Sequence, residues 1–170
     1  KRAEVIRRLI SALATEQCKD DADLISCLGS LKAEEAVAPL IRIVQNQKID
    51  LSVRETAAEA LGKIGGNAAV DALIIALSDD DIRKTAETQL VEIGGQKAKQ
   101  GKYDDAVNIY RKVLTGMKRS YPALVTQIDG ILKVLEPAGV TRTEREPQQT
   151  ATILADYLTK KFYTEEELAV

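Results

Sequence analysis

Histidine and tryptophan are absent from this 170-residue chain, and phenylalanine occurs once. Histidine is the side chain that most often performs acid–base catalysis at neutral pH, so nucleophile–histidine pairs are excluded. The two cysteines, Cys18 and Cys27, match no common zinc-ligand spacing, and no histidine is available to complete a site. The residues thus predict no catalytic, cofactor or metal site, and we expect the chain not to be an enzyme.

Long apolar runs and an excess of positive charge are also missing. No run approaches the roughly 20 residues that cross a bilayer, and no signal-peptide pattern is present, so we expect a cytoplasmic location without a membrane partner. The net charge is −2 and the pI is about 5.4, so the chain has no general basic surface for nucleic acid. Nucleic acid is therefore an unlikely partner.

Aliphatic residues must build the core, because hydrophobic residues make up 45% of the chain and aromatic residues only 4%. Such a core favours closely packed helices. Three eight-residue segments, beginning at Ile6, Val37 and Val70, are each apolar at their first, fourth, fifth and eighth positions. This is the pattern of a helix that buries one stripe. The segments begin 31 and 33 residues apart, which indicates a repeat.

A second series of predicted helices alternates with the first. These helices end near residues 28–31, 61–64 and 90–94, and small residues precede each end. Two helices in about 30 residues, with small side chains where one helix must approach another, predict an array of helical hairpins.

Residues 62–66, Gly-Lys-Ile-Gly-Gly, could also be interpreted as a phosphate-binding loop. Such a loop follows a β-strand, and its Walker form ends in Gly-Lys-Ser or Gly-Lys-Thr. Here a helical pattern precedes the glycines, and Asn67 and two alanines follow them. We therefore interpret Gly65 and Gly66 as the end of a helix in the left-handed conformation, and we expect Asn67 to cap the next helix.

Residues 53–65, followed by residues 69–77, resemble the HEAT repeat, in the subclass also found in phycobilisome lyases. The resemblance covers about residues 1–95. The start of the pattern recurs at residues 81–83, whereas Asp20 and Asp21 replace the expected Val and Arg in the first unit. The resemblance implies a structural ladder of polar contacts between neighbouring repeats, formed by Arg54, Arg83 and Asp81.

Residues 101–114 resemble the second helix of a tetratricopeptide (TPR) repeat, with a Gly-x-Tyr turn before the helix. Gly94 fits the first helix of the same family. We therefore assign residues 96–139 to a TPR-like hairpin packed on the array, with a further helix starting at Tyr121 and Pro122. A single unit of this kind does not form the peptide groove of TPR proteins.

The last segment, residues 140–170, is expected to hold a linker at residues 140–147 and a helix at residues 148–162. The apolar side of this helix is predicted to contain Ile153, Leu154, Tyr157, Leu158 and Phe162. Residues 164–167 predict the first turn of another helix. The C-terminal helix could pack on the array and cap it, or dock on a second subunit or partner, and both alternatives stay open.

The fold is thus predicted to be all-α: an α-solenoid of HEAT-like hairpins, then a TPR-like hairpin and a C-terminal helix. In HEAT arrays the outward side of each second helix tends to line the concave face. The candidate partner-binding residues on that face are Arg7, Arg8, Ser11, Arg42, Asp71 and Ile75. A plain solvated helix surface is the alternative interpretation.

Asp79, Asp80 and Asp81 stand where a helix must begin, and we expect them to cap it rather than to bind a divalent cation. The leading functional hypothesis is a non-catalytic scaffold or assembly factor that binds a protein partner on the concave face. A phycobilin lyase-like or phycobiliprotein-binding function is the alternative, and a nucleic-acid-binding HEAT protein is third.

Overall fold

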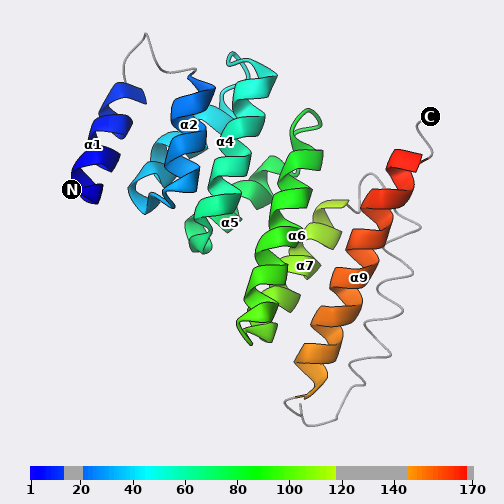
Figure 1. Ribbon diagram of the computed structural model, residues 1–170. Coiled ribbons are helices and arrows are strands. Elements are labelled where there is room, and N and C mark those ends of the chain that lie inside the picture. Colours follow the sequence, from blue (N-terminus) through cyan, green and yellow to red (C-terminus); the bar gives the residue numbers. More distant parts are fainter. Residues whose placement is uncertain (14–20, 118–144, 168–170) are drawn as a thin grey trace. The chain divides into compact units, whose positions relative to one another are not determined.

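The computed structural model describes residues 1–13, 21–117 and 145–167, and the side chains within them except those of residues 116–117, 145–146 and 160–167. All regular secondary structure in these ranges is helical (Figure 1). The all-α class predicted from the sequence is confirmed. The elements are α1 (Arg2–Leu13), α2 (Ala22–Ser30), the short 3-10 helix η1 (Glu34–Ala36), α3 (Val37–Gln45), α4 (Leu51–Ile64), α5 (Gly66–Ala76), α6 (Arg83–Lys99), α7 (Tyr103–Met117) and α9 (Arg145–Glu167).

The chain divides into two compact units, Lys1–Leu90 and Val91–Val170, which we call unit 1 and unit 2. In unit 1, α4 packs against α2, α3 and α5, while α3 also contacts α5. Helix α1 packs against α2 and η1. The neighbouring positions of α2 and α4 can be followed in Figure 1.

The predicted apolar stripes account for the core of unit 1. The three aligned segments lie in α1, α3 and α5, and each of their stripe positions is buried or half-buried. Leu9, Leu40 and Leu73 hold corresponding places; Leu40 and Leu73 are buried, and Leu9 is half-buried. Burial of such a stripe stabilises a helix that would be marginal in isolation. The helical repeat predicted from the sequence is therefore present.

Small residues allow close approaches between helices of unit 1. A Cβ atom added to Gly29 of α2 would lie 2.8 Å from the Cα atom of Ala60 in α4. A Cβ atom on Gly62 of α4 would overlap the side chain of Gln89 in α6. Glycine is needed at these two positions because the partner helix occupies the space of a side chain.

The glycine-rich stretch is the joint between α4 and α5. Gly65 and Gly66 have φ values of +69° and +80°, in the region that favours glycine. The prediction that Asn67 caps α5 is wrong. Helix α5 begins at Gly66, and its N-cap residue is Gly65. The start of the helix therefore has no hydrogen bond from a capping side chain. A helix precedes these glycines, whereas a phosphate loop follows a strand.

In unit 2, α7 packs against α9. Helix α9 already begins at Arg145, so residues 145–147, which were expected in the linker, are helical. Pro147 is compatible with this start because the first turn of a helix has no intrahelical partners for its N–H groups. Residues 164–167 continue the same helix and do not begin a new one. The helix expected from Tyr121 and Pro122, and residues 140–144 of the expected linker, lie outside the described residues.

The buried side of α9 differs from the predicted stripe. Ala151, Leu154 and Leu158 are buried, but Ile153 is 37% exposed. Tyr157 is half-buried, and the side chain of Phe162 lies outside the described ones. The buried side of α9 thus contains the small residue Ala151 and not Ile153. None of the helices in the described ranges combines the length and the apolar content needed to span a membrane.

Candidate functional site

The candidate surface consists of exposed side chains at corresponding positions of α1, α3 and α5, and we call it the α1–α3–α5 face. Its exposed members are Arg7, Arg8, Ser11, Ala38, Arg42, Asp71 and Ile75. Two further positions in the same register behave differently, since Pro39 is half-buried and Ala72 is buried. Helix α5 contacts both α3 and α4.

The α1 part of this face carries excess positive charge. Arg7 Nη1 and Arg8 Nε donate to the two carboxylate oxygens of Glu4, each at 3.1 Å. All three side chains are well exposed, so these ion pairs add little to stability. One carboxylate therefore serves two guanidinium groups, and one positive charge is left over.

The α3–α5 part of the face carries fewer positively charged side chains. Arg42 is exposed, and no ion-pair partner for it is found among the residues that the structure describes. Ile75 is 58% exposed, more than the other large hydrophobic side chains of the described part of the chain. Asp71 lies one helical turn before Ile75 on α5. The face thus changes from basic on α1 and α3 to apolar, with one carboxylate, on α5.

A buried arginine forms the main polar cluster in unit 1. The side chain of Arg54 on α4 is only 3% exposed. Its Nε donates to the carbonyl oxygen of Val44 at 3.1 Å, and its Nη2 donates to Oδ2 of Asp79. The cost of burying the guanidinium charge is thereby offset by a carboxylate and a backbone acceptor.

The three consecutive aspartates before α6 take different roles. Asp79 Oδ1 accepts the backbone N–H of Asp81 at 3.1 Å, while its other oxygen accepts Arg54. Asp81 is 70% exposed, with its Oδ2 3.9 Å from Nη1 of Arg54. Asp80 pairs with Arg83 at 2.6 Å, within its own segment. Asp79 is thus the principal partner of Arg54, a residue that the sequence analysis did not single out for this role.

This cluster can hold structure together, but its arrangement does not suggest a metal site. Within residues 1–13, 21–117 and 145–167, no group of three or more His, Cys, Asp or Glu side chains is arranged to hold a metal ion. The only signal in the sequence for the role of Asp79 is its place at the head of an aspartate run, shortly before the recurrence of the repeat pattern.

Unit 2 contains a fully buried tyrosine, Tyr110 of α7, which packs on a glycine. A Cβ atom on Gly94 of α6 would overlap the Tyr110 ring, at 2.8 Å from its Cζ. The Tyr110 hydroxyl has no hydrogen-bond partner among the described residues, and burial raises the pKa of this side chain above its ordinary value. Gly101, with φ of +76°, lies between α6 and α7, and Lys97 pairs with Asp105 at 3.8 Å across the turn.

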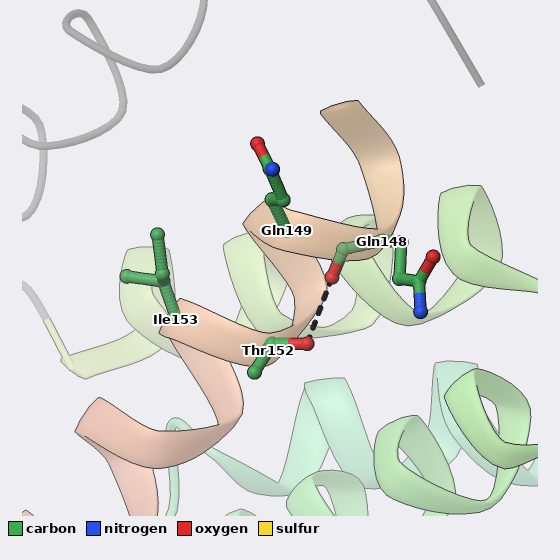
Figure 2. A pocket seen from close by; sticks show the side chains of 4 residues that line it. All are labelled: Gln148, Gln149, Thr152 and Ile153. Atoms are coloured by element: carbon green, nitrogen blue, oxygen red, sulfur yellow. Dashed lines mark hydrogen bonds between the residues drawn. The ribbon is translucent and has the colours of Figure 1, made fainter. Parts of the chain in front are cut away.

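A surface hollow of about 500 Å³ is lined by Gln148, Gln149, Thr152 and Ile153 of α9 (Figure 2). The Thr152 hydroxyl donates to the carbonyl oxygen of Gln148 at 2.9 Å, one helical turn earlier. The four side chains offer amide, hydroxyl and alkyl groups and no charge. Among the described residues that line this hollow, none titrates near neutral pH.

The paired, stacked helices of unit 1, with one buried stripe per helix and a contact between successive hairpins, define a helical-repeat protein. The sequence model of the family described as HEAT repeats matches residues 6–92. The chain belongs to this HEAT-repeat family.

One similar curated protein is the deoxyhypusine hydroxylase of Danio rerio. It is 27% identical to this chain over 134 residues, which cover 74% of this chain and 44% of the hydroxylase. The chain therefore spans less than half the length of this relative.

Proposed function

We propose that this chain is a non-catalytic, cytoplasmic interaction scaffold or assembly factor that binds a protein partner through the α1–α3–α5 face. One observation carries the proposal: three helices related by the repeat place exposed side chains at corresponding positions above a continuous buried stripe. Ser11, Arg42 and Ile75 hold corresponding positions in this row, and Arg7 lies one helical turn before Ser11. In HEAT arrays, the corresponding surface tends to line the concave side.

A catalytic function is the competing proposal, because the similar protein of Danio rerio is named a hydroxylase. The similarity is weak, and the chain spans 44% of that enzyme. We infer that the two proteins share the repeat framework. The absence of histidine from the whole 170-residue sequence supports this inference, since the usual general base is missing.

The finer family assignments also belong to the proposal. The contact between Gly94 and the Tyr110 ring, together with the positive φ of Gly101, supports a TPR-like hairpin formed by α6 and α7. The pattern of residues 53–77 supports repeats of the phycobilisome-lyase type. No specific observation favours a bilin or a nucleic acid as the ligand, and neither forms part of the proposed function.

The test is a comparison of two charge-reversal variants. The first combines Arg7→Glu, Arg8→Glu and Arg42→Glu. The second, a matched control with the same change in net charge, combines Lys32→Glu, Lys48→Glu and Lys63→Glu, three exposed residues outside the face. Far-UV circular dichroism verifies that both remain folded.

Each protein is used as bait, and the captured proteins are quantified by mass spectrometry. A true partner is expected to be retained by the wild type and the control and lost from the face variant. That partner is then purified, and its dissociation constant is measured against all three proteins. Equal binding by the two variants would overturn the proposed function.

A further inference from the structure

Resting on the proposed function, we propose that the α1–α3–α5 face binds an extended acidic segment of a partner protein that carries an apolar anchor at one end. Acidic side chains of the segment lie against Arg7, Arg8 and Arg42. The apolar side chain lies against Ile75. The segment therefore has a defined order along the face: acids toward α1, the apolar residue toward α5.

Charge complementarity fixes the acidic part. Arg7 and Arg8 share the single carboxylate of Glu4, and Arg42 has no ion-pair partner in the described part of the chain. A carboxylate brought to either place gains a charge-assisted hydrogen bond without breaking a buried pair. Guanidinium groups also match the planar geometry of carboxylates better than lysines do.

The α5 end of the face selects a different side chain. Ile75 exposes most of its surface to water, so covering it with an apolar group is favourable. Asp71, one turn earlier on the same helix, disfavours a second carboxylate at this end. An acidic residue and an apolar residue therefore cannot exchange places without losing both interactions.

The repeat sets the spacing. Helices α3 and α5 are in contact, and packed helices lie about 8–10 Å apart. An extended chain advances about 3.3 Å per residue, so one step between the helices corresponds to about three residues. Arg42 and Ile75 hold corresponding positions on these two helices, so the expected segment has an acidic residue at Arg42 and an apolar residue about three positions further on. For the second acidic residue, toward Arg7 and Arg8, the probe peptide uses the same step in the opposite direction.

The experiment uses two synthetic, fluorescently labelled peptides with the full chain. The ordered peptide has aspartate at its first and fourth positions and leucine at its seventh, with glycine and serine between. The permuted peptide has the same composition, but the leucine stands between the two aspartates. Fluorescence anisotropy measures the dissociation constant of each peptide for the wild type, Arg42→Glu, Ile75→Ser and the control Lys63→Glu.

The wild type is expected to bind the ordered peptide about ten-fold more tightly than the permuted one, because burial of one leucine side chain corresponds to about that factor. Ile75→Ser should abolish this preference, and Arg42→Glu should weaken the binding of both peptides. Lys63→Glu should change neither. Equal binding of both peptides by the wild type, or a preference that survives Ile75→Ser, would overturn the inference. Displacement of the ordered peptide by an equal concentration of a single-stranded oligonucleotide would also overturn it.

The outcome separates this inference from the proposed function. A purified protein partner that depends on Arg7, Arg8 and Arg42, combined with no preference between the peptides, refutes the acidic–apolar segment and leaves the docking face in place. If charge reversal of these arginines changes neither the binding of the partner nor the binding of the peptides, both proposals are refuted.

Discussion

The guanidinium group of Arg54 donates to the carboxylate of Asp79, a residue 25 positions later in the chain. Arg54 lies in the first turn of α4, and Asp79 lies in the segment between α5 and α6. The same guanidinium reaches back to the carbonyl oxygen of Val44 at the end of α3. One buried side chain thus connects three parts of unit 1.

Asp79→Asn and Asp81→Asn form a pair of isosteric variants that measures this connection. Asp79→Asn removes the charge that offsets buried Arg54, and the free energy of unfolding is expected to fall by about 2 kcal/mol. Asp81, exposed and 3.9 Å from Arg54, should contribute no more than about 0.5 kcal/mol. Urea denaturation followed by far-UV circular dichroism provides the comparison. Similar losses in the two variants would contradict the dominance of Asp79.

Gly94→Ala and Gly95→Ala test the close contact between α6 and α7. The first places a methyl group into the Tyr110 ring and should lower the free energy of unfolding by about 1–3 kcal/mol. At Gly95 a Cβ atom would meet, among the described residues, only the Tyr110 hydroxyl, at 3.9 Å. Alanine is a better helix former than glycine, so Gly95→Ala should raise the free energy of unfolding by about 0.5–1 kcal/mol. Thermal and urea denaturation should therefore show opposite signs for neighbouring residues, and equal signs would argue against this packing.

Tyr110→Phe removes a buried hydroxyl that has no hydrogen-bond partner in the described part of the chain. The free energy of unfolding at neutral pH is expected to rise by about 1 kcal/mol, because a desolvated donor is eliminated. The matched control is Tyr103→Phe, whose side chain is only half-buried. A loss of stability in Tyr110→Phe would show that the hydroxyl is satisfied in the folded protein.

The same variant gives a pH dependence. Burial raises the pKa of Tyr110 above 10.0, so the folded state holds this proton more tightly than the unfolded state does. Above about pH 10 the unfolded state loses this proton before the folded state does, so the stability of the wild type falls as the pH rises above that value. The stability difference between the wild type and Tyr110→Phe should therefore be constant up to about pH 9 and then shift in favour of the variant. Urea denaturation at a series of pH values measures it, and a constant difference throughout would refute the assignment.

Leu158→Ala and Ile153→Ala test which side of α9 is buried. Leu158 is fully buried, and its truncation should lower the free energy of unfolding by about 2–4 kcal/mol. Ile153 is 37% exposed, so its truncation should cost less than about 1 kcal/mol. Denaturation of the two variants side by side would settle the orientation. A larger effect at Ile153 would support the stripe predicted from the sequence.

The sequence predicts the core of unit 1 well because apolar periodicity is a local property of each helix. Leu9, Leu40 and Leu73 recur in register, and a helix with such an apolar stripe is expected to turn that stripe toward its neighbours. The buried face of α9 could not be predicted in this way. Apolar residues occur on more than one side of this helix, and the sequence alone does not tell that Ala151 is buried and Ile153 exposed.

The polar contacts were harder to predict than the core. The sequence of three consecutive aspartates does not indicate which of them pairs with Arg54. The conformation of the turn before α6 determines that pairing. Asn67 looked like a helix cap because asparagine is common in that role, but Gly65 and Gly66 let α5 begin two residues earlier. The candidate face could be outlined from the repeat alone, whereas the pairing of Arg7 and Arg8 with one carboxylate required the structure.

The two hydrogen bonds of Arg54, to Val44 and to Asp79, affect how the helices of unit 1 unfold locally. Repeats that touch only through apolar surfaces can fray one at a time from an end. Here α3, α4 and the segment before α6 are joined through one side chain, so releasing any of them would leave a buried charge or carbonyl unsatisfied. The amide protons of α3 and α4 should therefore exchange with solvent in a single concerted event, which makes this part of the chain one cooperative unit.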